Sequence, residues 1–317
     1  MTQAIAQSEM SVLFIGNSFT FMNDMPFTFQ KMADSAGHSI FVDTVVEGGK
    51  DLKYHCDQAE TFEKISSRKW DYVVIQCSSW ELAAPNDKIE QTTTPFAKKI
   101  IDSVRANSNC TNVIFYMTWG YKFGNNNWTP IASYETMQEK IRGNYMAIGE
   151  KFDAIISPVG IVWKKIRDTN KAINLYDPDL RHPSAIGSYI SACTFFSVIL
   201  GKSPIGNTEL GGVAAEDALY VQGLASETVL DNLSTWRLRH EDFNFRSGFD
   251  IQQKGCELKL NCTAVGATNV EYSFGDGNSS TQIDPSHIYE AIGEFTITQK
   301  VISGCKSRIL QRTIKID

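Results

Sequence analysis

The chain has 317 residues, of which 42% are hydrophobic and 21% are charged, and its net charge at pH 7 is −6. This composition is typical of globular proteins that bury a sizeable core, and the length suits a large domain with a smaller one. Lysine and arginine form no basic cluster, which argues against nucleic acid or an anionic membrane surface as the main partner. No apolar run approaches the roughly 20 residues that span a bilayer, so no membrane insertion is expected.

The first two thirds of the chain alternate between near-continuous apolar runs and longer amphipathic stretches. Uninterrupted apolar runs are typical of parallel strands that are covered on both faces. We expect strands over 11–16, 40–46, 72–77, 112–119 and 154–159. We expect helices between them over 25–36, 52–67, 94–106 and 131–151. This alternation predicts an α/β fold with a flavodoxin-like, doubly wound parallel sheet.

The remainder of the chain contains two further helices and then changes character. A polar loop over 168–182 leads into a strongly apolar helix over 183–200, and Pro183 suits its first turn because proline has no N–H to leave unpaired. Another helix is expected near 215–230. From about Phe249, short alternating runs are separated by Gly, Asp, Asn and Ser turns, which predicts a small β-sandwich. We interpret 237–247 as a linker and predict domains over 8–240 and 249–317.

The chain has seven cysteines, an odd number, so at least one thiol is unpaired unless chains are cross-linked. Four of them lie in predicted α/β segments, where a buried free thiol is the ordinary state. These four are Cys56, Cys77, Cys110 and Cys193. In the predicted sandwich, a bridge between Cys256 and Cys305 is one hypothesis, and Cys262 is a competing partner.

Three residues that suit nucleophilic catalysis are expected at one edge of the sheet, because the carboxyl ends of parallel strands meet there. Ser18 follows the first strand, and the loop after the fifth strand carries Asp179 and His182. A serine hydroxyl is a poor nucleophile until an imidazole takes its proton, and that imidazole needs an acceptor to hold its tautomer. Asp179 and His182 are three residues apart, so one short turn can present both towards Ser18.

The same edge offers donors for the oxyanion of a tetrahedral intermediate. The backbone N–H of Ser18 is one, the N–H of Gly49 is a second, and the side-chain amide of Gln76 is a candidate third. Each residue also has an ordinary structural interpretation: a serine that caps a helix, a glycine in a turn, or an amide that satisfies buried backbone. Their convergence on one edge favours the catalytic interpretation.

Aromatic residues in the loops that leave this edge are candidates for contact with a sugar. We select Trp80 and Trp119 as substrate-binding residues, although a tryptophan there can equally cover the core. His55 lies one turn into the helix after Gly49, and we interpret it as a solvated or core histidine rather than a residue of the site.

The segment Gly-Asn-Ser18-Phe resembles the first conserved block of the SGNH (GDSL-like) hydrolases. Gly49 matches the glycine of the second block, and the stretch from Asp179 to His182 matches the closing Asp-x-x-His block. The resemblance covers roughly residues 10–230. It implies a three-layer α/β/α fold and hydrolysis of esters, commonly acetyl groups on carbohydrates, without a metal or other cofactor.

The sequence departs from the SGNH pattern in the third block. Where the family usually has Gly-x-Asn-Asp, this chain has Ser-Ser-Trp80-Glu81, so the asparagine that completes the oxyanion hole is missing there. Asn17 replaces the usual acidic residue before the serine. An α/β-hydrolase is rejected because its nucleophile lies deep in the chain within Gly-x-Ser-x-Gly, and Thr20 stands here in place of the second glycine. A phosphate-binding site at the helix start after the first strand is another alternative, but it is disfavoured because it gives no role to Asp179 and His182.

The last quarter of the chain resembles a PKD domain. The matching residues are Tyr272-Ser-Phe-Gly-Asp276-Gly, then His287-Ile-Tyr289 and Gly293-Glu-Phe295. The resemblance implies an Ig-like sandwich of the kind found in extracellular bacterial proteins. The opening residues 1–7 are short and small-residue-rich, like the tail of a cleaved secretion signal. We therefore expect a secreted, periplasmic or cell-surface protein.

Taken with the resemblance, these residues predict a secreted serine esterase that acts on acyl esters, in particular acetyl esters of carbohydrates. One alternative is a non-catalytic glycan-binding protein that keeps the fold. Another is a lipase- or thioesterase-like activity on longer acyl chains.

Overall fold

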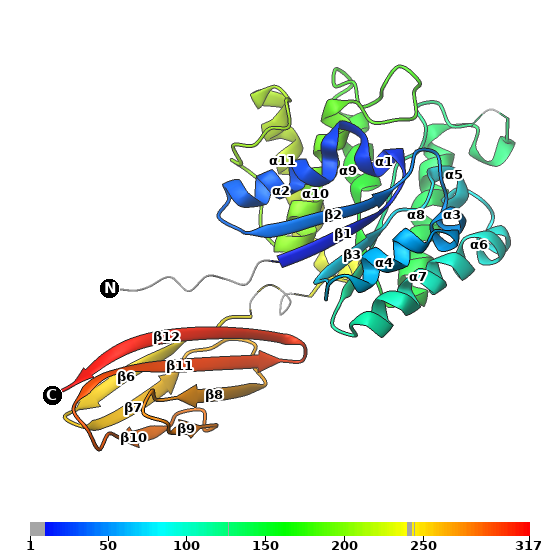
Figure 1. Ribbon diagram of the computed structural model, residues 1–317. Coiled ribbons are helices and arrows are strands. Elements are labelled where there is room, and N and C mark those ends of the chain that lie inside the picture. The colour runs from blue at the N-terminus through cyan, green and yellow to red at the C-terminus, as the bar shows by residue number, and fades with distance from the viewer. Residues whose placement is uncertain (1–9, 126, 240–242, 244) are drawn as a thin grey trace. The chain divides into compact units, whose positions relative to one another are not determined.

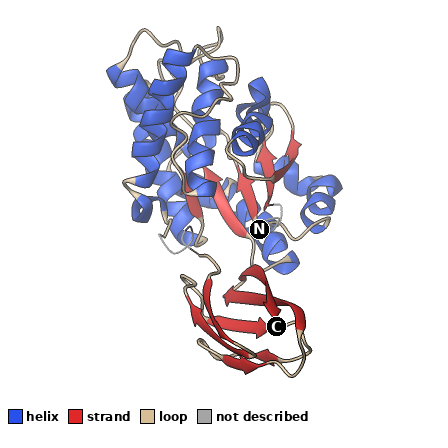
Figure 2. Ribbon diagram, turned by 90° about the vertical axis from the view of Figure 1, so that its left-hand side faces the viewer, coloured by secondary structure: helices blue, strands red, loops and turns tan. Residues whose placement is uncertain are grey.

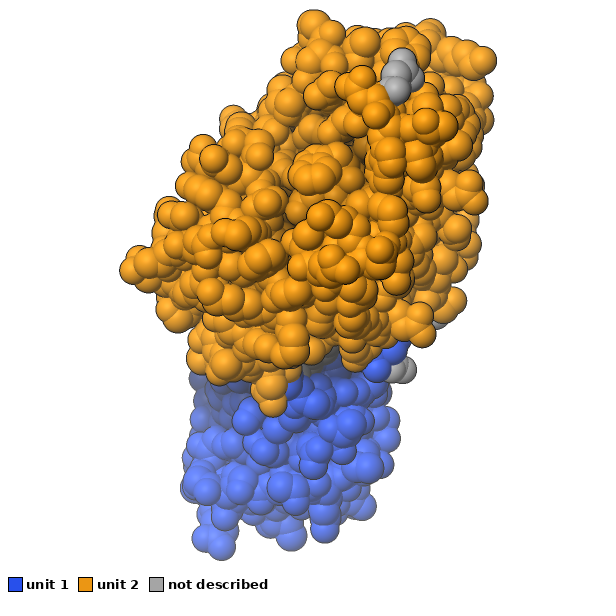
Figure 3. Space-filling view, turned by 90° about the vertical axis from the view of Figure 1, so that its right-hand side faces the viewer, with its two compact units in different colours: residues 1–7, 239–317 blue, residues 8–238 orange. Residues whose placement is uncertain are grey.

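The computed structural model describes residues 10–125, 127–239, 243 and 245–317. The chain divides into two compact units, residues 8–238 and residues 1–7 with 239–317, drawn in orange and blue in Figure 3. The break between Leu238 and Arg239 falls inside the segment 237–247 that is predicted as a linker. Residues 240–242 and 244 of that segment lie outside the described residues, as do the predicted signal remnant and the rest of residues 1–9.

The larger unit is built on a parallel sheet of five strands in the order β2-β1-β3-β4-β5 (Figure 1). The strands are β1 (Met10–Gly16), β2 (Ile40–Val46), β3 (Tyr72–Ile75), β4 (Asn112–Tyr116) and β5 (Ile155–Ser157). The side chains of residues 12–15 in β1 are wholly buried, because helices cover both faces of the sheet. Residues of β1 and β2 pair in register up to Gly16 and Val46, so the two strands end side by side.

Helices lie on both faces of this sheet (Figures 1 and 2). On one face, α2 (Met25–Ser35), α9 (Val159–Thr169) and α11 (Ala215–Leu230) pack around α10 (Ala185–Leu200). On the other face, α3 (Leu52–Asp57) and α4 (Ala59–Ser66) pack against α7 (Thr94–Asn107), and α8 (Tyr134–Lys151) follows. The shorter helices are α1 (Ser18–Phe21), η1 (Met22–Asp24), α5 (Ser79–Leu82), α6 (Asn86–Thr92), η2 (Thr129–Ile131) and η3 (Leu233–Trp236). The predicted doubly wound α/β fold is confirmed.

Three details of the predicted helices are wrong. The single helix expected over 52–67 is two helices, because Gln58 between them is extended (φ −100°, ψ 128°). Helix α9 is not predicted at all. Pro183 does not lie in the first turn of α10: the helix begins at Ala185, and the Ser184 hydroxyl caps it by accepting from the N–H of Gly187 (3.2 Å).

The smaller unit is a β-sandwich of two antiparallel sheets, in the orders β10-β7-β6 and β12-β11-β8-β9. Their strands are β6 (Phe249–Lys254), β7 (Glu257–Cys262), β8 (Asn269–Ser273), β9 (Ser279–Ser280), β10 (Ser286–Ile288), β11 (Gly293–Ser303) and β12 (Lys306–Ile316). The unit has its own buried core, and the Tyr289 hydroxyl donates to the carbonyl of Phe274 (2.8 Å). Asp276 accepts from the N–H of Asn278 (3.0 Å), an interaction that is typical of an aspartate in a turn.

The cysteines follow the sequence expectation only in part. Cys56, Cys77 and Cys193 are buried free thiols, but Cys110 is exposed. Cys256 and Cys262 are also free thiols, so the predicted bridge between Cys256 and Cys305 is wrong.

None of the helices in the described part of the chain combines the length and the apolar character needed to cross a membrane.

Candidate active site

Ser18 is the first residue of α1, directly after β1, at the carboxyl edge of the sheet. The side chain of Asn17 caps this helix by accepting from the N–H of Phe19 (3.1 Å). The turn into the helix leaves no room for a side chain at position 16, since a Cβ there would lie 2.5 Å from Oγ1 of Thr20. Glycine at this position therefore allows the strand to pass directly into a helix that presents Ser18.

The structure brings the three predicted catalytic residues together. Oγ of Ser18 lies 2.8 Å from Nε2 of His182, although 164 positions separate them in the chain. The other ring nitrogen of His182, Nδ1, is hydrogen-bonded to Oδ2 of Asp179. Hydroxyl, imidazole and carboxylate thus form the continuous chain of contacts that activates a serine.

The turn that carries Asp179 and His182 is closed by its own backbone. The N–H of Asp177 donates to the carbonyl of His182, and the N–H of Leu180 donates to the carbonyl of Asp177 (2.9 Å each). Oδ1 of Asp179 accepts from the backbone N–H groups of Arg181 and His182 (3.0 Å each). The acid and the base are therefore held by one short segment.

The electrostatics of the turn favour an ionised Asp179. Partial burial by itself would raise the pKa of Asp179, but the hydrogen bonds from the His182 ring and from the two backbone N–H groups outweigh it, so the pKa is lowered. An ionised carboxylate at Nδ1 holds the proton on that nitrogen and leaves Nε2 free to accept from Ser18. The ring of Phe19 packs edge-on against the imidazole, with ring centroids 5.1 Å apart.

Gly49 lies in a loop that is fixed on both sides to the nucleophile segment. The N–H of Glu47 donates to the carbonyl of Gly16 (3.2 Å), and Nδ2 of Asn17 donates to the carbonyl of Lys50 (2.9 Å). Gly49 has a positive φ of 70°, a conformation that favours glycine. Among the described residues, the N–H groups of Gly49 and Ser18 have no acceptor, so both can donate to a substrate oxygen.

Gln76 does not supply the predicted third oxyanion donor. Its side chain is buried, and Oε1 accepts from the N–H of Asn17 (2.8 Å) and from the hydroxyl of Thr20 (3.0 Å). Nε2 of Gln76 donates to the carbonyl of Cys77 (2.7 Å). The amide is therefore fixed beneath the nucleophile turn, and its role is to support that turn.

Trp119 is not a substrate-binding residue, because it is wholly buried. Its indole is stacked between Trp163 and Phe19, with centroids 4.0 and 5.0 Å away, so neither face is open to a sugar. Its Nε1 donates to the carbonyl of Arg181 (3.0 Å) and thereby supports the turn that carries His182. Trp80 lies in α5 after β3 and is 54% exposed, so contact with a substrate stays a prediction for this residue.

His55 is a core histidine, in line with its ordinary interpretation. It is buried in α3, and its Nε2 is hydrogen-bonded to the carbonyl of Gly16 (2.9 Å). Burial lowers the pKa of His55. The residue therefore supports the backbone that precedes the nucleophile.

Glu81 is a buried carboxyl group behind the nucleophile that the sequence does not single out. Its Oε2 accepts from the N–H of Ser78 (3.0 Å), and Oγ of Ser78 accepts in turn from Nδ2 of Asn17 (3.1 Å). Burial raises the pKa of Glu81 to about 7, and the charge of Asp51 adds to this rise. The pairing of Ser78 with Glu81 three residues later is the sequence signal of a capping box.

Asn23 connects the segment that follows Ser18 to the helix that follows His182. Its Nδ2 donates to the carbonyl of Pro183 (3.2 Å) and to the hydroxyl of Ser188 (2.9 Å). The Ser188 hydroxyl donates back to the carbonyl of Met22 (3.0 Å). Asn23 has a positive φ of 55°, which asparagine tolerates better than most residues. The pair Asn23-Asp24 was the available sequence signal for such a turn.

Known proteins resemble this chain in structure rather than in sequence. No protein-family model matches it, and no curated protein gives a significant match. It is similar to the crystal structure of a DUF4886 family protein from Bacteroides uniformis, with a TM-score of 0.61 and 18% identity, over 70% of this chain and 95% of that one. It is also similar to an acetyl xylan esterase from Geobacillus stearothermophilus, with a TM-score of 0.42 and 19% identity, over 62% of this chain and 96% of that one.

The last part of the chain is similar to the PKD1 domain of a Vibrio cholerae metalloprotease, with a TM-score of 0.22 and 25% identity, over 22% of this chain and 94% of that domain. Proteins whose descriptions propose an SGNH hydrolase and a GDSL-like lipase are among the other similar structures. The chain therefore combines a three-layer α/β/α unit, whose fold it shares with the DUF4886 family protein, and a small antiparallel β-sandwich.

Proposed function

We propose that this protein is a serine esterase that hydrolyses acyl esters through a covalent acyl-enzyme. The observation that carries the proposal is the contact of 2.8 Å between Oγ of Ser18 and Nε2 of His182, with Asp179 on the far side of the ring. A serine that only caps a helix does not require an oriented imidazole at its hydroxyl.

The reaction proceeds in two halves. Oγ of Ser18 attacks the ester carbonyl while Nε2 of His182 takes the hydroxyl proton, and the oxyanion accepts from the N–H groups of Ser18 and Gly49. The C–O bond to the alcohol then breaks, and the imidazolium gives its proton to the leaving oxygen. Water attacks the acyl-serine with His182 as base, and the acid leaves with Ser18 restored.

We further propose that the substrate is an extracellular ester, in particular an acetyl ester of a carbohydrate. The resemblance of the first and last sequence blocks to SGNH hydrolases supports ester hydrolysis. The PKD-like unit supports a location outside the cytoplasm, since such domains occur beside secreted enzymes. A series of p-nitrophenyl esters of rising chain length separates this proposal from a lipase-like activity, because an acetyl esterase favours the shortest acyl group.

The first test is turnover of p-nitrophenyl acetate. We expect Ser18→Ala to lower kcat by about 10⁴-fold or more, because it removes the nucleophile. Ser66→Ala is the matched control, since Ser66 is an exposed serine at the end of α4. A serine-reactive phosphonate should add one phosphonyl group, located on Ser18 by mass spectrometry. Equal slow hydrolysis by the wild type and by Ser18→Ala would overturn the proposal in favour of a non-catalytic glycan-binding protein.

A further inference from the structure

A shallow groove of about 390 Å³ lies beside the loop that contains Gly48. Its walls come from the end of β2 and the loop after it, from α1 and η1, and from the start of α2, and they include the rings of Phe21 and Phe27. These rings are 37% and 41% exposed to solvent. The volume of the groove lies in the range of small-ligand sites, roughly 300–1,000 Å³.

The groove adjoins the nucleophile. Phe21 lies three residues after Ser18 in α1, so the two residues are neighbours on the same side of that helix. A Cβ placed on Gly48 would lie 3.9 Å from Cζ of Phe21, so this ring packs along the segment that leads to Gly49. The groove therefore lies beside the two segments that carry Ser18 and Gly49.

The charged groups of the groove are carboxylates, which only accept hydrogen bonds, and Thr44 also lines it. The side chains of Asp24 and Glu47 line it, and neither has a hydrogen-bond or ion-pair partner among the described residues. An alkyl chain in this place would remove water from two carboxylates without replacing their hydrogen bonds, which is costly. An anionic ligand would be repelled. The groove suits a neutral ligand that offers several hydroxyl donors together with an apolar face that stacks on an aromatic ring.

We propose that the groove binds the sugar ring that forms the alcohol part of the ester, with Phe27 as the stacking platform and Asp24 and Glu47 as acceptors of its hydroxyl groups. The inference rests on the proposed esterase function. It identifies the leaving group of the reaction, the alcohol released when the ester bond breaks, as a sugar. A pyranose has the required combination of hydroxyl donors along its edge and C–H groups on its face.

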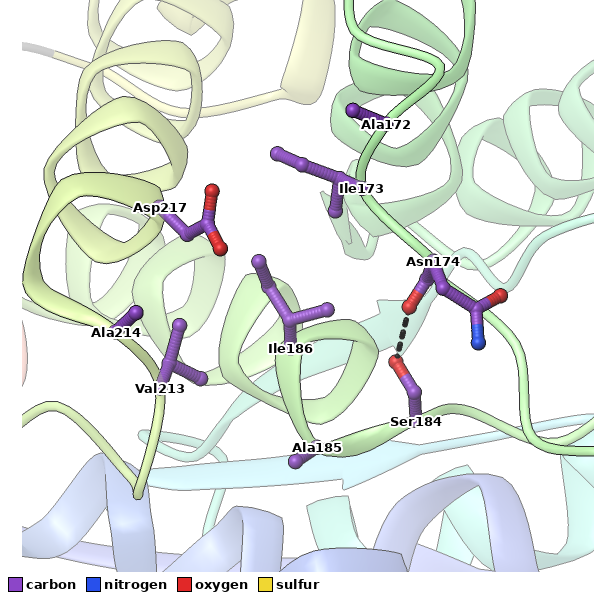
Figure 4. Close-up of a pocket in the computed structure, with 9 residues that line it drawn as sticks. All are labelled: Ala172, Ile173, Asn174, Ser184, Ala185, Ile186, Val213, Ala214 and Asp217. Carbon is purple, nitrogen blue, oxygen red and sulfur yellow. Dashed lines mark hydrogen bonds between the residues drawn. The ribbon is translucent and has the colours of Figure 1, made fainter.

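A second hollow, of about 290 Å³, lies where α10 and α11 begin (Figure 4). Figure 4 shows the hydroxyl of Ser184 directed at the carbonyl of Asn174, to which it donates (2.8 Å). The side chains of Ile173, Ile186 and Val213 make much of its wall aliphatic. It has no aromatic ring among its lining residues, so the groove beside Gly48 is the better sugar site.

The experiment is a titration of the full-length wild-type chain with methyl β-D-xylopyranoside, followed by the NMR shifts of the Gly48 and Gly49 backbone amides. We expect saturable shifts at these amides. Phe27→Ala should raise the dissociation constant about tenfold, and Phe27→Trp should restore binding, because it returns an aromatic face. Leu219→Ala is the matched control, since Leu219 is also an exposed apolar residue, on α11, and it should leave the dissociation constant unchanged.

The sugar contains no ester, so its binding is read without turnover and is separate from the test of Ser18. The inference is overturned if the sugar shifts neither amide, or if Phe27→Ala leaves its dissociation constant unchanged. It is also overturned if 1-octanol or choline, tested in the same way, produces these shifts and the sugar does not. The first of these two ligands would assign the groove to an acyl chain and the second to a cation.

Discussion

Asp179 uses its two carboxylate oxygens for different tasks. Oδ2 contacts the ring of His182, and Oδ1 accepts from the backbone N–H groups of Arg181 and His182. The two tasks can be separated by a substitution that keeps a hydrogen-bond acceptor for the backbone N–H groups and removes the acceptor for the His182 ring. Asparagine is such a residue, because its carbonyl oxygen accepts while its amide nitrogen only donates.

We expect Asp179→Asn to lower kcat by about 10²–10⁴-fold with little change in KM, because the histidine then loses the acceptor that fixes its tautomer. The measurement is p-nitrophenyl acetate kinetics, with a thermal melt to verify folding. Asp177→Asn is the matched control, since Asp177 is an exposed carboxylate in the same turn. A decrease in kcat of the same size in both variants would contradict this role of Asp179.

Glu81 makes stability depend on pH. Its pKa is raised from 4.5 to about 7, so the folded state binds its proton more tightly than the unfolded state does. The contribution of this group to stability is therefore complete below about pH 4.5 and is lost as the pH rises through about 7. Glu81→Gln keeps the acceptor of the capping box and removes the titration.

We expect Glu81→Gln to be more stable than the wild type at pH 8, by an amount on the order of 3 kcal/mol, and to lose this advantage near pH 4.5. Urea unfolding at several pH values measures the difference. Glu63→Gln, at an exposed position of α4, is the control and should follow the wild type. A difference that does not vary with pH would contradict the raised pKa.

The roles of residues whose partners lie a few positions away in the sequence were predictable. The roles of residues whose partners are set by burial in the folded chain were not. The spacing of Asp179 and His182 and the position of Ser18 after β1 were sufficient to select these three residues. Trp119 was assigned wrongly because its position after a strand does not reveal which way the ring turns. Gln76 was assigned wrongly because its amide is used by Asn17 and Thr20, contacts that depend on the folded turn.

At the scale of elements, the side chain of Asn23, between α1 and α2, is hydrogen-bonded to the start of α10. One of these segments follows Ser18 and the other follows His182. The hydrogen bonds of Asn23, which we call the fastening, therefore set the distance between Ser18 and His182. Asn23→Gly removes the fastening and at the same time suits the positive φ at this position.

We expect Asn23→Gly to lower kcat/KM about tenfold while changing stability by no more than about 1 kcal/mol, because the relief of backbone strain offsets the lost hydrogen bonds. Kinetics and thermal melts of the same preparation measure both. Asp153→Gly is the control, since Asp153 has a similar positive φ (47°) before β5, at the opposite end of the sheet. Unchanged kcat/KM in Asn23→Gly would show that the fastening does not position the nucleophile.

The strands were predictable as elements, whereas helix α9 and the break between α3 and α4 were not. Apolar runs identify β1 to β4 because both faces of the sheet are covered. Helix α9 was not predicted, and it contains Gly160, a residue that is unfavourable within a helix, in its first turn. The glycine is there for packing: a Cβ would lie 2.0 Å from the carbonyl oxygen of Thr118. The break at Gln58 has no glycine or proline to indicate it, so it could not be seen in the sequence.

At the scale of the whole molecule, the change in pattern near residue 249 identified a second unit because its strands bury alternate residues in a core of their own. The residues proposed for catalysis and for the sugar groove all lie within 8–238. We expect a fragment of residues 8–238 to hydrolyse p-nitrophenyl acetate with kcat/KM within about threefold of the full chain, because the chemistry uses only that unit. Loss of activity in a folded fragment would show that the smaller unit contributes to the site.

The self-closed turn between Asp177 and His182 has a consequence for how such a site can vary. Since acid and base are joined by local hydrogen bonds, a displacement of this segment moves both as one body. The distance between the imidazole and the serine hydroxyl can then differ between related proteins, while the hydrogen bond between the carboxylate and the imidazole stays the same.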